Sequence, residues 1–287
     1  MIDVSTQVRP ADLKDQQQIA NLMFFETHVH RHLDWCTPLE WLGSPFFWVI
    51  ENNGKIIAAL SCPKDPPRIA WVRLFVHTGL LSLEVAWETL WEKAKYYIGQ
   101  QESATVAAIA LPTWFRTLLL QSGFQNHQQI VTMEWNGQTA PKCSHPKDLN
   151  IRPMTPDDIP GVAEVDGAAF NPLWRNSIAS IKRAYPQALI ATVAETEGCL
   201  IGYQISTPNP FGAHLARLAV VQEAQHHGLG TALVCDLINQ LIKRNILHLT
   251  VNTQDDNYSS LALYQKIGFV RTEEQYPVFV YEVTSKK

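Results

Sequence analysis

The stretch Gln225-His226-His227-Gly228-Leu229-Gly230 decides the fold. It follows the apolar run 215–221 and opens a helical pattern over 231–242. A strand that passes through a glycine turn into a helix leaves several backbone N–H groups pointing at one place, where the helix dipole adds about half a positive charge. Glycine has no Cβ atom, so Gly228 and Gly230 let a phosphate approach the backbone. The stretch therefore predicts a phosphate or pyrophosphate site at a strand-to-helix turn.

Length and composition describe a soluble globular protein. The chain has 287 residues, enough for two domains that each bury a core, with 46% hydrophobic and 17% charged residues. The 23 Lys and Arg residues against 27 Asp and Glu give a net charge of −4, without the basic excess typical of nucleic-acid-binding proteins. No run approaches 18 apolar residues, so we expect no membrane partner. Small-molecule or peptide partners are expected, and the oligomeric state is left open.

The cysteines are scattered, odd in number and free of Cys-x-x-Cys spacing, which predicts reduced thiols. They are Cys36, Cys62, Cys143, Cys199 and Cys235. Residues 1–10 contain no apolar signal segment, so a cytoplasmic location is expected.

The sequence repeats itself weakly at an interval of about 144 residues. Val8-Arg9-Pro10 recurs as Ile151-Arg152-Pro153, and Gly123-Phe124 recurs as Gly268-Phe269. A repeat of this length predicts two similar domains. The predicted parts are a domain at 1–137, a linker at 138–148 and a domain at 149–287.

Each half reads as strands and helices in the same order, with hairpins at 46–60 and 188–206. The predicted fold class is α+β, in which each domain is a mixed, mostly antiparallel sheet with helices on both faces. In the second half the predicted strands are 149–153, 189–195, 200–207, 213–221, 247–252 and 277–283. The predicted helices are 156–169, 174–184, 228–243 and 257–266.

With these elements in place, the second half resembles the GNAT superfamily of acyl-CoA-dependent N-acyltransferases. The motifs that carry the resemblance are Leu218-Ala219-Val220, Gln225 with the glycines at 228 and 230, Asn257, Leu263-Tyr264 and Gly268-Phe269. The resemblance covers 149–283 closely and 5–135 only in outline. It implies tandem GNAT domains, the first degenerate, and acetyl-CoA as co-substrate.

The resemblance also implies how acetyl-CoA is held. The strand 213–221 would be splayed from the strand 247–252, so that its unpaired backbone bonds the pantetheine amides. The N–H groups of 225–231 would hold the pyrophosphate, and Asn257 would reach the pantetheine arm. The cofactor-binding residues implied in this way are Leu218, Ala219, Val220, Gln225, His226, His227, Gly228, Leu229, Gly230, Thr231 and Asn257.

Tyr264 stands where the family keeps its general acid. A phenol with a pKa of about 10, held at hydrogen-bond range, is suited to give a proton to a departing thiolate. The alternative interpretation of Tyr264 is a core aromatic residue on an amphipathic helix.

His214 is the candidate general base. It lies six residues before Val220, where histone-acetylating relatives keep a catalytic Glu, and an imidazole accepts a proton near neutral pH. Strand alternation places residues 214, 216, 218 and 220 on one face, and Arg217 on the other in a salt bridge. A surface position at the end of a strand is the alternative for His214.

Relatives that acetylate protein N termini have a Glu at the position of Asn252. Its absence here leaves open a base that works through water, with Asp255 or Asp256. Candidates for the lining of the acceptor site, or alternatively for ordinary packing between helix and sheet, are Phe170, Trp174, Arg175 and Tyr203.

In the first half the cofactor motif is lost. Leu81, Glu84 and Ala86 stand at the positions of the glutamine and the two glycines, and Leu119 replaces the tyrosine. A carboxylate repels a pyrophosphate, and a side chain in place of glycine closes the approach to the backbone. The first half is therefore predicted to be a scaffold.

Two further patterns in the first half have simple interpretations. His28, His30 and His32 suggest a metal site, since His28 and His32 would share one face of a helix. Apart from Glu26 or Asp34, no Cys, Asp or Glu at close spacing completes a convincing set of ligands, so no metal site is predicted. Trp87, Trp91 and Ala94 fall at helical spacing and are predicted core residues.

Together these patterns predict an acetyl-CoA-dependent N-acetyltransferase. It would move an acetyl group to a primary amine, on a peptide N terminus or a small molecule, by direct attack in a ternary complex. The alternative is a non-catalytic CoA-binding or sensing module, suggested by the missing carboxylate base. The length of the acyl group and the identity of the amine are left open.

Overall fold

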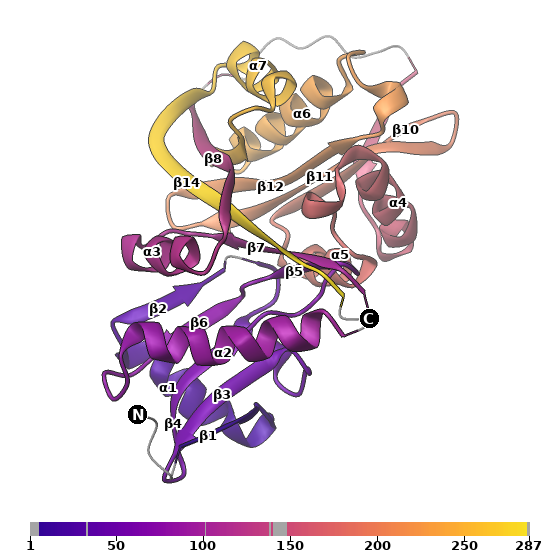
Figure 1. Ribbon diagram of the computed structural model, residues 1–287. Coiled ribbons are helices and arrows are strands. Elements are labelled where there is room, and N and C mark those ends of the chain that lie inside the picture. The colour runs from indigo at the N-terminus through magenta and orange to yellow at the C-terminus, as the bar shows by residue number, and fades with distance from the viewer. Residues whose placement is uncertain (1–5, 33, 101, 138, 140–147, 286–287) are drawn as a thin grey trace. The chain divides into compact units, whose positions relative to one another are not determined.

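The computed structural model describes residues 6–32, 34–100, 102–137, 139 and 148–285 (Figure 1). The chain divides into two compact units, unit 1 with residues 1–127 and 277–287, and unit 2 with residues 128–276. Of the predicted linker at 138–148, all but residues 139 and 148 lie outside the described residues. Both units are of the α+β class, as predicted.

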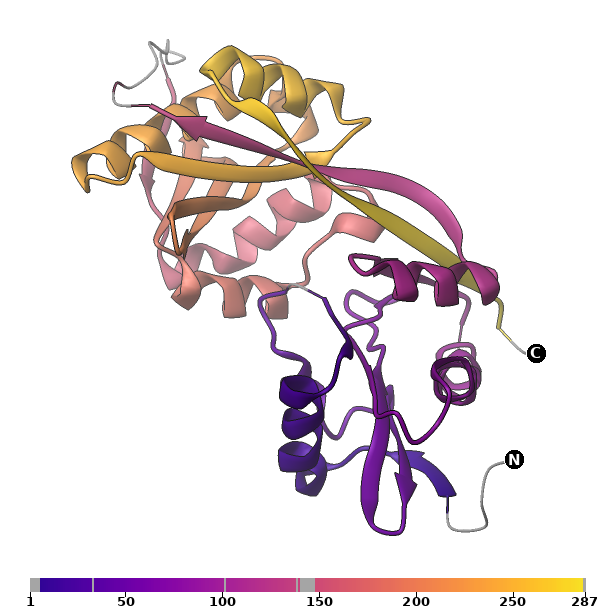
Figure 2. The same ribbon diagram turned by 90° about the vertical axis from the view of Figure 1, so that its left-hand side faces the viewer.

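Unit 2 is built on a mixed sheet in the order β14-β8-β13-β12-β11-β10-β9. Its strands are β8 (Gln125–Asn136), β9 (Asn150–Pro153), β10 (Ile190–Thr196), β11 (Cys199–Asn209), β12 (Gly212–Val220), β13 (His248–Gln254) and β14 (Val270–Val283). Its helices are α4 (Ile159–Ala169), α5 (Ile178–Ala184), α6 (Leu229–Lys243) and α7 (Tyr258–Ile267), with short 3₁₀ turns at η3 (Pro156–Asp158), η4 (Pro172–Trp174), η5 (Tyr185–Gln187) and η6 (Gln222–Ala224). Helices α6 and α7 cover one face of the sheet and α4 the other (Figure 1, Figure 2).

Unit 1 contains two groups of strands, in the orders β1-β3-β4-β6-β2 and β5-β7-β14. Its own elements are β1 (Thr6–Pro10), β2 (His28–Arg31), β3 (Phe47–Asn52), β4 (Lys55–Ser61), β5 (Ile69–Trp71), β6 (Leu74–His77), β7 (Ala104–Ile109), α1 (Gln16–Phe25), α2 (Leu83–Ile98) and α3 (Thr113–Gln121), with 3₁₀ turns η1 (Leu13–Asp15) and η2 (Pro38–Trp41). Trp87, Trp91 and Ala94 of α2 are buried in its core, as predicted.

The repeated sequence motif has the same structural role in both units. An arginine of the first strand binds the aspartate six residues later and a glutamate of the neighbouring strand. The two trios are Arg9, Asp15 and Glu51 in unit 1, and Arg152, Asp158 and Glu195 in unit 2. In each trio the guanidinium makes two hydrogen bonds to the aspartate, the geometry that a planar fork favours. The repeat in the sequence therefore reflects a repeat of the fold.

The predicted hairpins are present and their turns follow from the sequence. Asn53 and Gly54 both have positive φ, as do Glu197 and Gly198. Two successive residues with positive φ form the tight turn whose twist matches two antiparallel strands. The hairpins β3–β4 and β10–β11 are fixed in register in this way.

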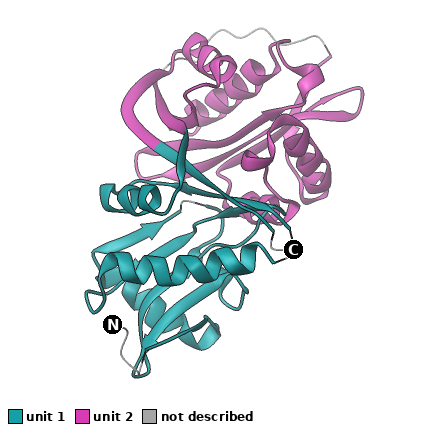
Figure 3. Cartoon of the chain, viewed as in Figure 1, with its two compact units in different colours: residues 1–127, 277–287 teal, residues 128–276 magenta. Residues whose placement is uncertain are grey.

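The two repeats exchange their last strands (Figure 3). Strand β8 ends the first repeat, yet within unit 2 it pairs with β13, with Glu134 opposite Thr250. Strand β14 ends the second repeat, yet from Pro277 onward it belongs to unit 1 and pairs with β7. The compact units therefore differ from the contiguous division at 1–137 and 149–287. The last strand also begins at Val270, earlier than the predicted 277.

Three further predictions can be compared with the structure. His28 lies on strand β2 rather than on a helix, so the shared helical face with His32 is wrong. Cys36, Cys62 and Cys199 are free thiols, but Cys235 is disulfide-bonded, so the prediction of reduced cysteines is wrong there. Sequence spacing does not reveal which cysteines approach one another. Among the described residues, no helix is long and apolar enough to span a membrane, and no group of three or more potential ligands is arranged to hold a metal ion.

Candidate active site

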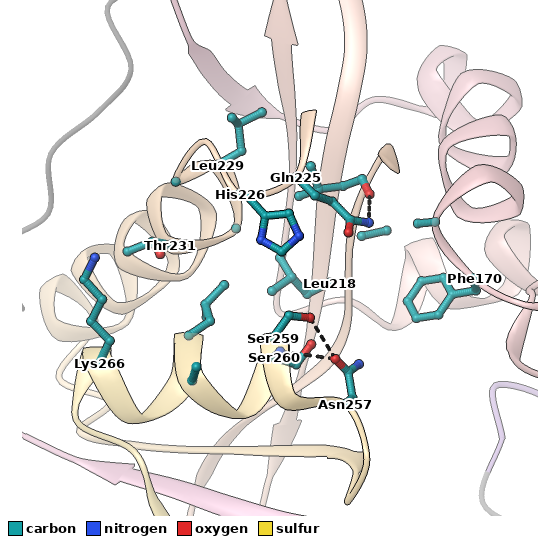
Figure 4. A pocket seen from close by; sticks show the side chains of 17 residues that line it. Phe170, Leu218, Gln225, His226, Leu229, Thr231, Asn257, Ser259, Ser260 and Lys266 are labelled. Atoms are coloured by element: carbon teal, nitrogen blue, oxygen red, sulfur yellow. Dashed lines mark hydrogen bonds between the residues drawn. The ribbon is translucent and has the colours of Figure 1, made fainter. Parts of the chain in front are cut away.

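A pocket of about 420 Å³ lies in unit 2 between the end of β12 and the first turns of α6 and α7 (Figure 4). Its lining residues are Ala169, Phe170, Leu218, Ala219, Val220, Gln225, His226, Gly228, Leu229, Gly230, Thr231, Asn257, Ser259, Ser260, Ala262, Leu263 and Lys266. All the predicted cofactor-binding residues except His227 are among them. The exposed ring of His227 instead contacts the Gln225 carbonyl at 2.7 Å.

The first turn of α6 presents unpaired backbone N–H groups to this pocket. Gly228, the residue before the helix, is left-handed with φ of 83°, and no side chain caps the helix there. The first helical bond runs from Ala232 N–H to the Gly228 carbonyl at 2.9 Å, so the amides before Ala232 have no helical acceptor. The Gln225 side chain donates to the Val220 carbonyl at 3.0 Å and ties the turn to its strand. The turn is suited to bind an anion such as a pyrophosphate.

The two glycines of the motif serve different purposes. A Cβ atom on Gly228 would have open space, but the positive φ of this residue is costly for any other amino acid. A Cβ atom on Gly230 would lie 2.7 Å from the Leu263 side chain. Gly228 therefore shapes the turn, whereas Gly230 allows α6 and α7 to approach each other beside the pocket.

Strands β12 and β13 separate along their length. They pair in parallel only where 213–215 face 249–251. Beyond Leu215, the backbone of β12 has partners on β11 but leaves the β13 ladder. This splay leaves N–H and C=O groups of β12 free on one edge, as required to bond an extended amide chain. At about 3.3 Å per residue, the free edge from Leu215 to Val220 extends for roughly 17 Å.

A bulge in β12 changes which side chains share a face. Ile205 pairs with Arg217 and Ser206 with Leu215, which leaves Ala216 without a partner on β11. Leu215 and Leu218 consequently pack in the same core, against α6. The predicted strict alternation over 214–220 is therefore wrong, because it assumed an uninterrupted ladder.

His214 lies on the face opposite Leu215 and Leu218. Its Nδ1 atom is 2.8 Å from the Thr250 hydroxyl oxygen on β13. Partial burial lowers the pKa of His214, so the imidazole is neutral near pH 7 and available to accept a proton. The pairing of 213–215 with 249–251 places this imidazole beside the closed end of the splay.

Arg217 forms the predicted salt bridge, but on the α4 side of the sheet. Its guanidinium binds Asp166 of α4 at 2.7 Å and lies 3.5 Å from the centre of the Phe170 ring. Tyr203 donates its hydroxyl to Asp166 at 2.6 Å and is fully buried, which raises its pKa. Of the candidate acceptor-lining residues, Phe170 lines the pocket, whereas Tyr203 belongs to this buried network.

The other two candidates for the acceptor lining also make polar contacts. The Trp174 indole donates to Gln128 at 3.0 Å, and Arg175 donates to the Phe170 carbonyl at 2.8 Å. Asp255 and Asp256, the candidates for a base that works through water, accept hydrogen bonds from strand β8: the backbone N–H of residue 129 donates to Asp255 and the side chain of residue 128 to Asp256.

Tyr264 points into the core rather than into the pocket lining. It packs in the cluster that also contains Leu215 and Val251, the last paired residues before the splay. Burial raises the pKa of Tyr264, so its phenol is protonated near neutral pH. A protonated phenol is thus held in the core on the α6 and α7 side of the sheet, the face opposite His214.

The pocket also has lining residues on α7 that the motifs did not include, namely Ser259, Ser260, Ala262 and Lys266. Asn257 caps α7, accepting a hydrogen bond from the Ser260 N–H at 3.2 Å and from the Ser259 hydroxyl at 3.0 Å. Ser259, Leu263 and Lys266 follow at spacings of three and four residues, which places them on one helix face. This spacing was available in the sequence once Asn257 was taken as the start of a helix.

Known acetyltransferases are similar to this part of the chain. A family model described as the acetyltransferase (GNAT) family matches residues 159–269. An uncharacterised N-acetyltransferase of Methanocaldococcus jannaschii is 27% identical over 121 residues, which are 42% of this chain and 76% of that protein. A mycothiol acetyltransferase of Amycolatopsis mediterranei is 26% identical over 179 residues, which are 55% of this chain and 59% of that protein.

The fold similarity extends over both units. The solved structure of a tandem GNAT protein from the clavulanic acid biosynthesis pathway has a TM-score of 0.65 at 18% identity, with 98% of this chain and 100% of that chain covered. At this identity the likeness concerns the fold alone. The family model falls on the unit that carries the pocket, so residues 159–269 match the acetyltransferase (GNAT) family, and the two units together have the fold of tandem GNAT proteins.

Proposed function

We propose that unit 2 binds acetyl-CoA and transfers its acetyl group to a primary amine by direct attack in a ternary complex. The single observation that carries the proposal is the geometry of β12. One end of this strand leads into the uncapped turn before α6, and the other end closes the splay beside His214, with Tyr264 in the core on the opposite face. An anion site and a proton-transfer site are thus joined by about 17 Å of unpaired backbone.

The binding roles follow from the lining of the pocket. The amides of 226–231 would hold the pyrophosphate, helped by the positive end of the α6 dipole. Lys266 on α7 would add a positive charge near the phosphates. The free edge at 216–220 would bond the pantetheine amides, and the Asn257 side chain would face the same arm.

When bound, acetyl-CoA supplies an acetyl group activated as a thioester. Free N–H groups of β12 would donate to the carbonyl oxygen as negative charge develops on it. The amine nitrogen bonds to the carbonyl carbon, the carbon–sulfur bond breaks, and His214 takes the proton that the amine loses. Tyr264 gives its proton to the departing thiolate. A proton then passes through solvent from His214 to Tyr264, which restores both groups.

The proposal is tested by CoA calorimetry and by thiol release from acetyl-CoA with a panel of primary amines and peptides with free N termini. Tyr264→Phe removes the acid but keeps the ring, so we expect kcat to fall on the order of 10²–10⁴-fold with CoA affinity unchanged. Tyr97→Phe in α2 is the matched control and retains full turnover. The proposal is wrong if CoA does not bind, or if Tyr264→Phe turns over like the wild type.

The same assay separates a second candidate function. A non-catalytic CoA-binding or sensing module would bind CoA stoichiometrically and release no thiol with any member of the panel. The transferase is favoured by the position of His214 at the closed end of the splay, where its imidazole is neutral near pH 7, and by the protonated Tyr264 phenol in the core on the opposite face.

A further inference from the structure

A row of polar side chains crosses three neighbouring strands at the closed end of the splay. His214 on β12 is opposite Thr250 on β13, and Thr250 is opposite Glu134 on β8. Residues directly opposite each other project to the same face, with Cβ atoms about 4.5–5.5 Å apart. The hydrogen bond between His214 and Thr250 agrees with this placement.

This row faces away from the core of unit 2. The alternate residues of the same strands, Met133, Leu249 and Val251, pack in the core beneath α6 and α7. The Glu134 side chain keeps 40% of its surface exposed, and the His248 imidazole next to it is 3.3 Å from its carboxylate. Asn252 on the same face is exposed as well. The face is therefore open to solvent next to the splay.

Within this row Glu134 carries the negative charge. His214 is neutral near pH 7 because burial lowers its pKa, and the remaining side chain of the row, Thr250, is uncharged, as is Asn252 on the same face. An amine that moves along this face from β8 toward the splay meets Glu134, then Thr250, then His214. The carboxylate is thus placed to meet the positive form of the amine before the base does.

We propose that Glu134 binds the ammonium group of the acceptor, so that the acceptor class is alkylammonium compounds rather than amines that are uncharged at neutral pH. The bound ammonium gives one proton to solvent before the amine attacks, and His214 takes the second proton during the transfer. The inference rests on the proposed function and specifies its acceptor. It also assigns a role to the first repeat, because Glu134 lies on the strand which that repeat contributes to unit 2. Unit 2, which carries the CoA motif, thus takes its acceptor-binding carboxylate from the repeat that lacks this motif.

The test measures binding, so that it does not depend on turnover. Phenethylamine, as the ammonium probe, is titrated into the full-length protein saturated with CoA, and phenethyl alcohol is the uncharged counterpart. Glu134→Gln should weaken binding of phenethylamine about tenfold or more, since hydrogen bonds to charged groups contribute about 1.5–3 kcal/mol. Binding of the alcohol and of CoA should be unchanged. Glu134→Asp, which keeps the charge, should recover part of the loss.

The control is Glu164→Gln, which removes an exposed carboxylate from α4 and should bind phenethylamine like the wild type. Equal affinity of the wild type and Glu134→Gln for phenethylamine would overturn the inference, as would a wild type that binds the alcohol as well as the amine. Ammonium binding that depends on Glu134, without acetyl transfer to any amine of the panel, would contradict the proposed transferase chemistry and leave this inference standing.

Discussion

The first turns of α6 and α2 show how the two repeats differ. Helix α6 follows Gly228, which is left-handed and provides no side-chain cap. Helix α2 follows Ser82, whose hydroxyl accepts a hydrogen bond from the Val85 N–H at 3.3 Å, and Glu84 lies in its first turn. In unit 2 the helix amides are left for a ligand. In unit 1 the chain satisfies one of them itself and adds a carboxylate that repels anions.

The strands before these helices also differ, because β12 has an unpaired edge and β6 is paired on both sides. Beyond Leu215, the edge of β12 that faces β13 is unpaired. By the repeat, 74–76 of β6 correspond to 218–220 of β12, but every residue of β6 is paired with β4 on one side and with β2 on the other. Strand β2 thus occupies the edge that would bond a pantetheine arm. The first repeat has kept the fold and filled the ligand positions with its own groups.

The largest expected effect is on stability at low pH and concerns His30, a buried residue of β2. It tests how β2 is held in place. This side chain is buried, stacks on Phe115 at 4.0 Å and contacts the Val72 carbonyl at 3.0 Å. Burial lowers the pKa of His30 from about 6.5 to about 4. The unfolded chain therefore binds more protons below pH 6.5, so stability is full above that pH and falls as pH drops through about 4. The loss attributable to His30 is roughly 3 kcal/mol.

Urea unfolding at pH 7, 5 and 4 measures this loss. His30→Gln keeps a polar group near the Val72 carbonyl but does not titrate, so its stability should fall less steeply with acid. His127→Gln, at an exposed position of β8, should retain the wild-type slope. If the free energy of unfolding fell equally with pH in His30→Gln and in the wild type, the neutral, buried His30 would not be what holds β2 in place.

The second prediction concerns a variant that makes the turn before α6 in unit 2 resemble the turn before α2 in unit 1. Gly228→Glu places a carboxylate where the first repeat has Glu84 and forces a non-glycine residue to a φ of 83°. We expect the free turn of the variant to relax from this φ, so that CoA binding must restore a strain of about 1–2 kcal/mol, and charge repulsion adds about 1 kcal/mol. Together they predict a roughly hundredfold weaker affinity for CoA, measured by calorimetry. Gly54→Glu imposes similar strain in a hairpin of unit 1, where φ is 76°. It should leave CoA affinity unchanged, and a comparable loss in that control would refute a local role for Gly228.

Much of this comparison was predictable from local sequence. The motif at 225–230, the helix start at Asn257 and the turns at Asn53-Gly54 and Glu197-Gly198 depend on residues close together in the chain. Their backbone requirements are specific, because few residues tolerate positive φ or cap a helix. The α+β fold, the repeat and most of the pocket lining follow from such signals.

What could not be predicted depends on pairing between distant segments. Strands β8 and β14 are equivalent in the repeat, and either could complete either sheet, so sequence periodicity does not reveal their exchange. The bulge at Ala216 moves the side chains after it to the other face, although the apolar pattern reads as a simple strand. The residues of strand β2, which include His28 and His30, do not form a pattern that predicts a strand. Consequently the position of Glu134 beside Thr250 could not be predicted from the sequence and follows only from the register of β8 and β13.

The smallest expected effect distinguishes between two features that block a CoA site in unit 1, the Ser82 cap of α2 and the pairing of β2 with β6. Ser82→Ala removes the cap of α2 and should lower the stability of unit 1 by about 1 kcal/mol in urea unfolding. It should not create a second CoA site, because β2 still covers the edge of β6. Calorimetry should therefore keep a stoichiometry of one CoA per chain. If Ser82→Ala bound a second CoA, the cap alone would have blocked the site and the pairing of β2 would be incidental.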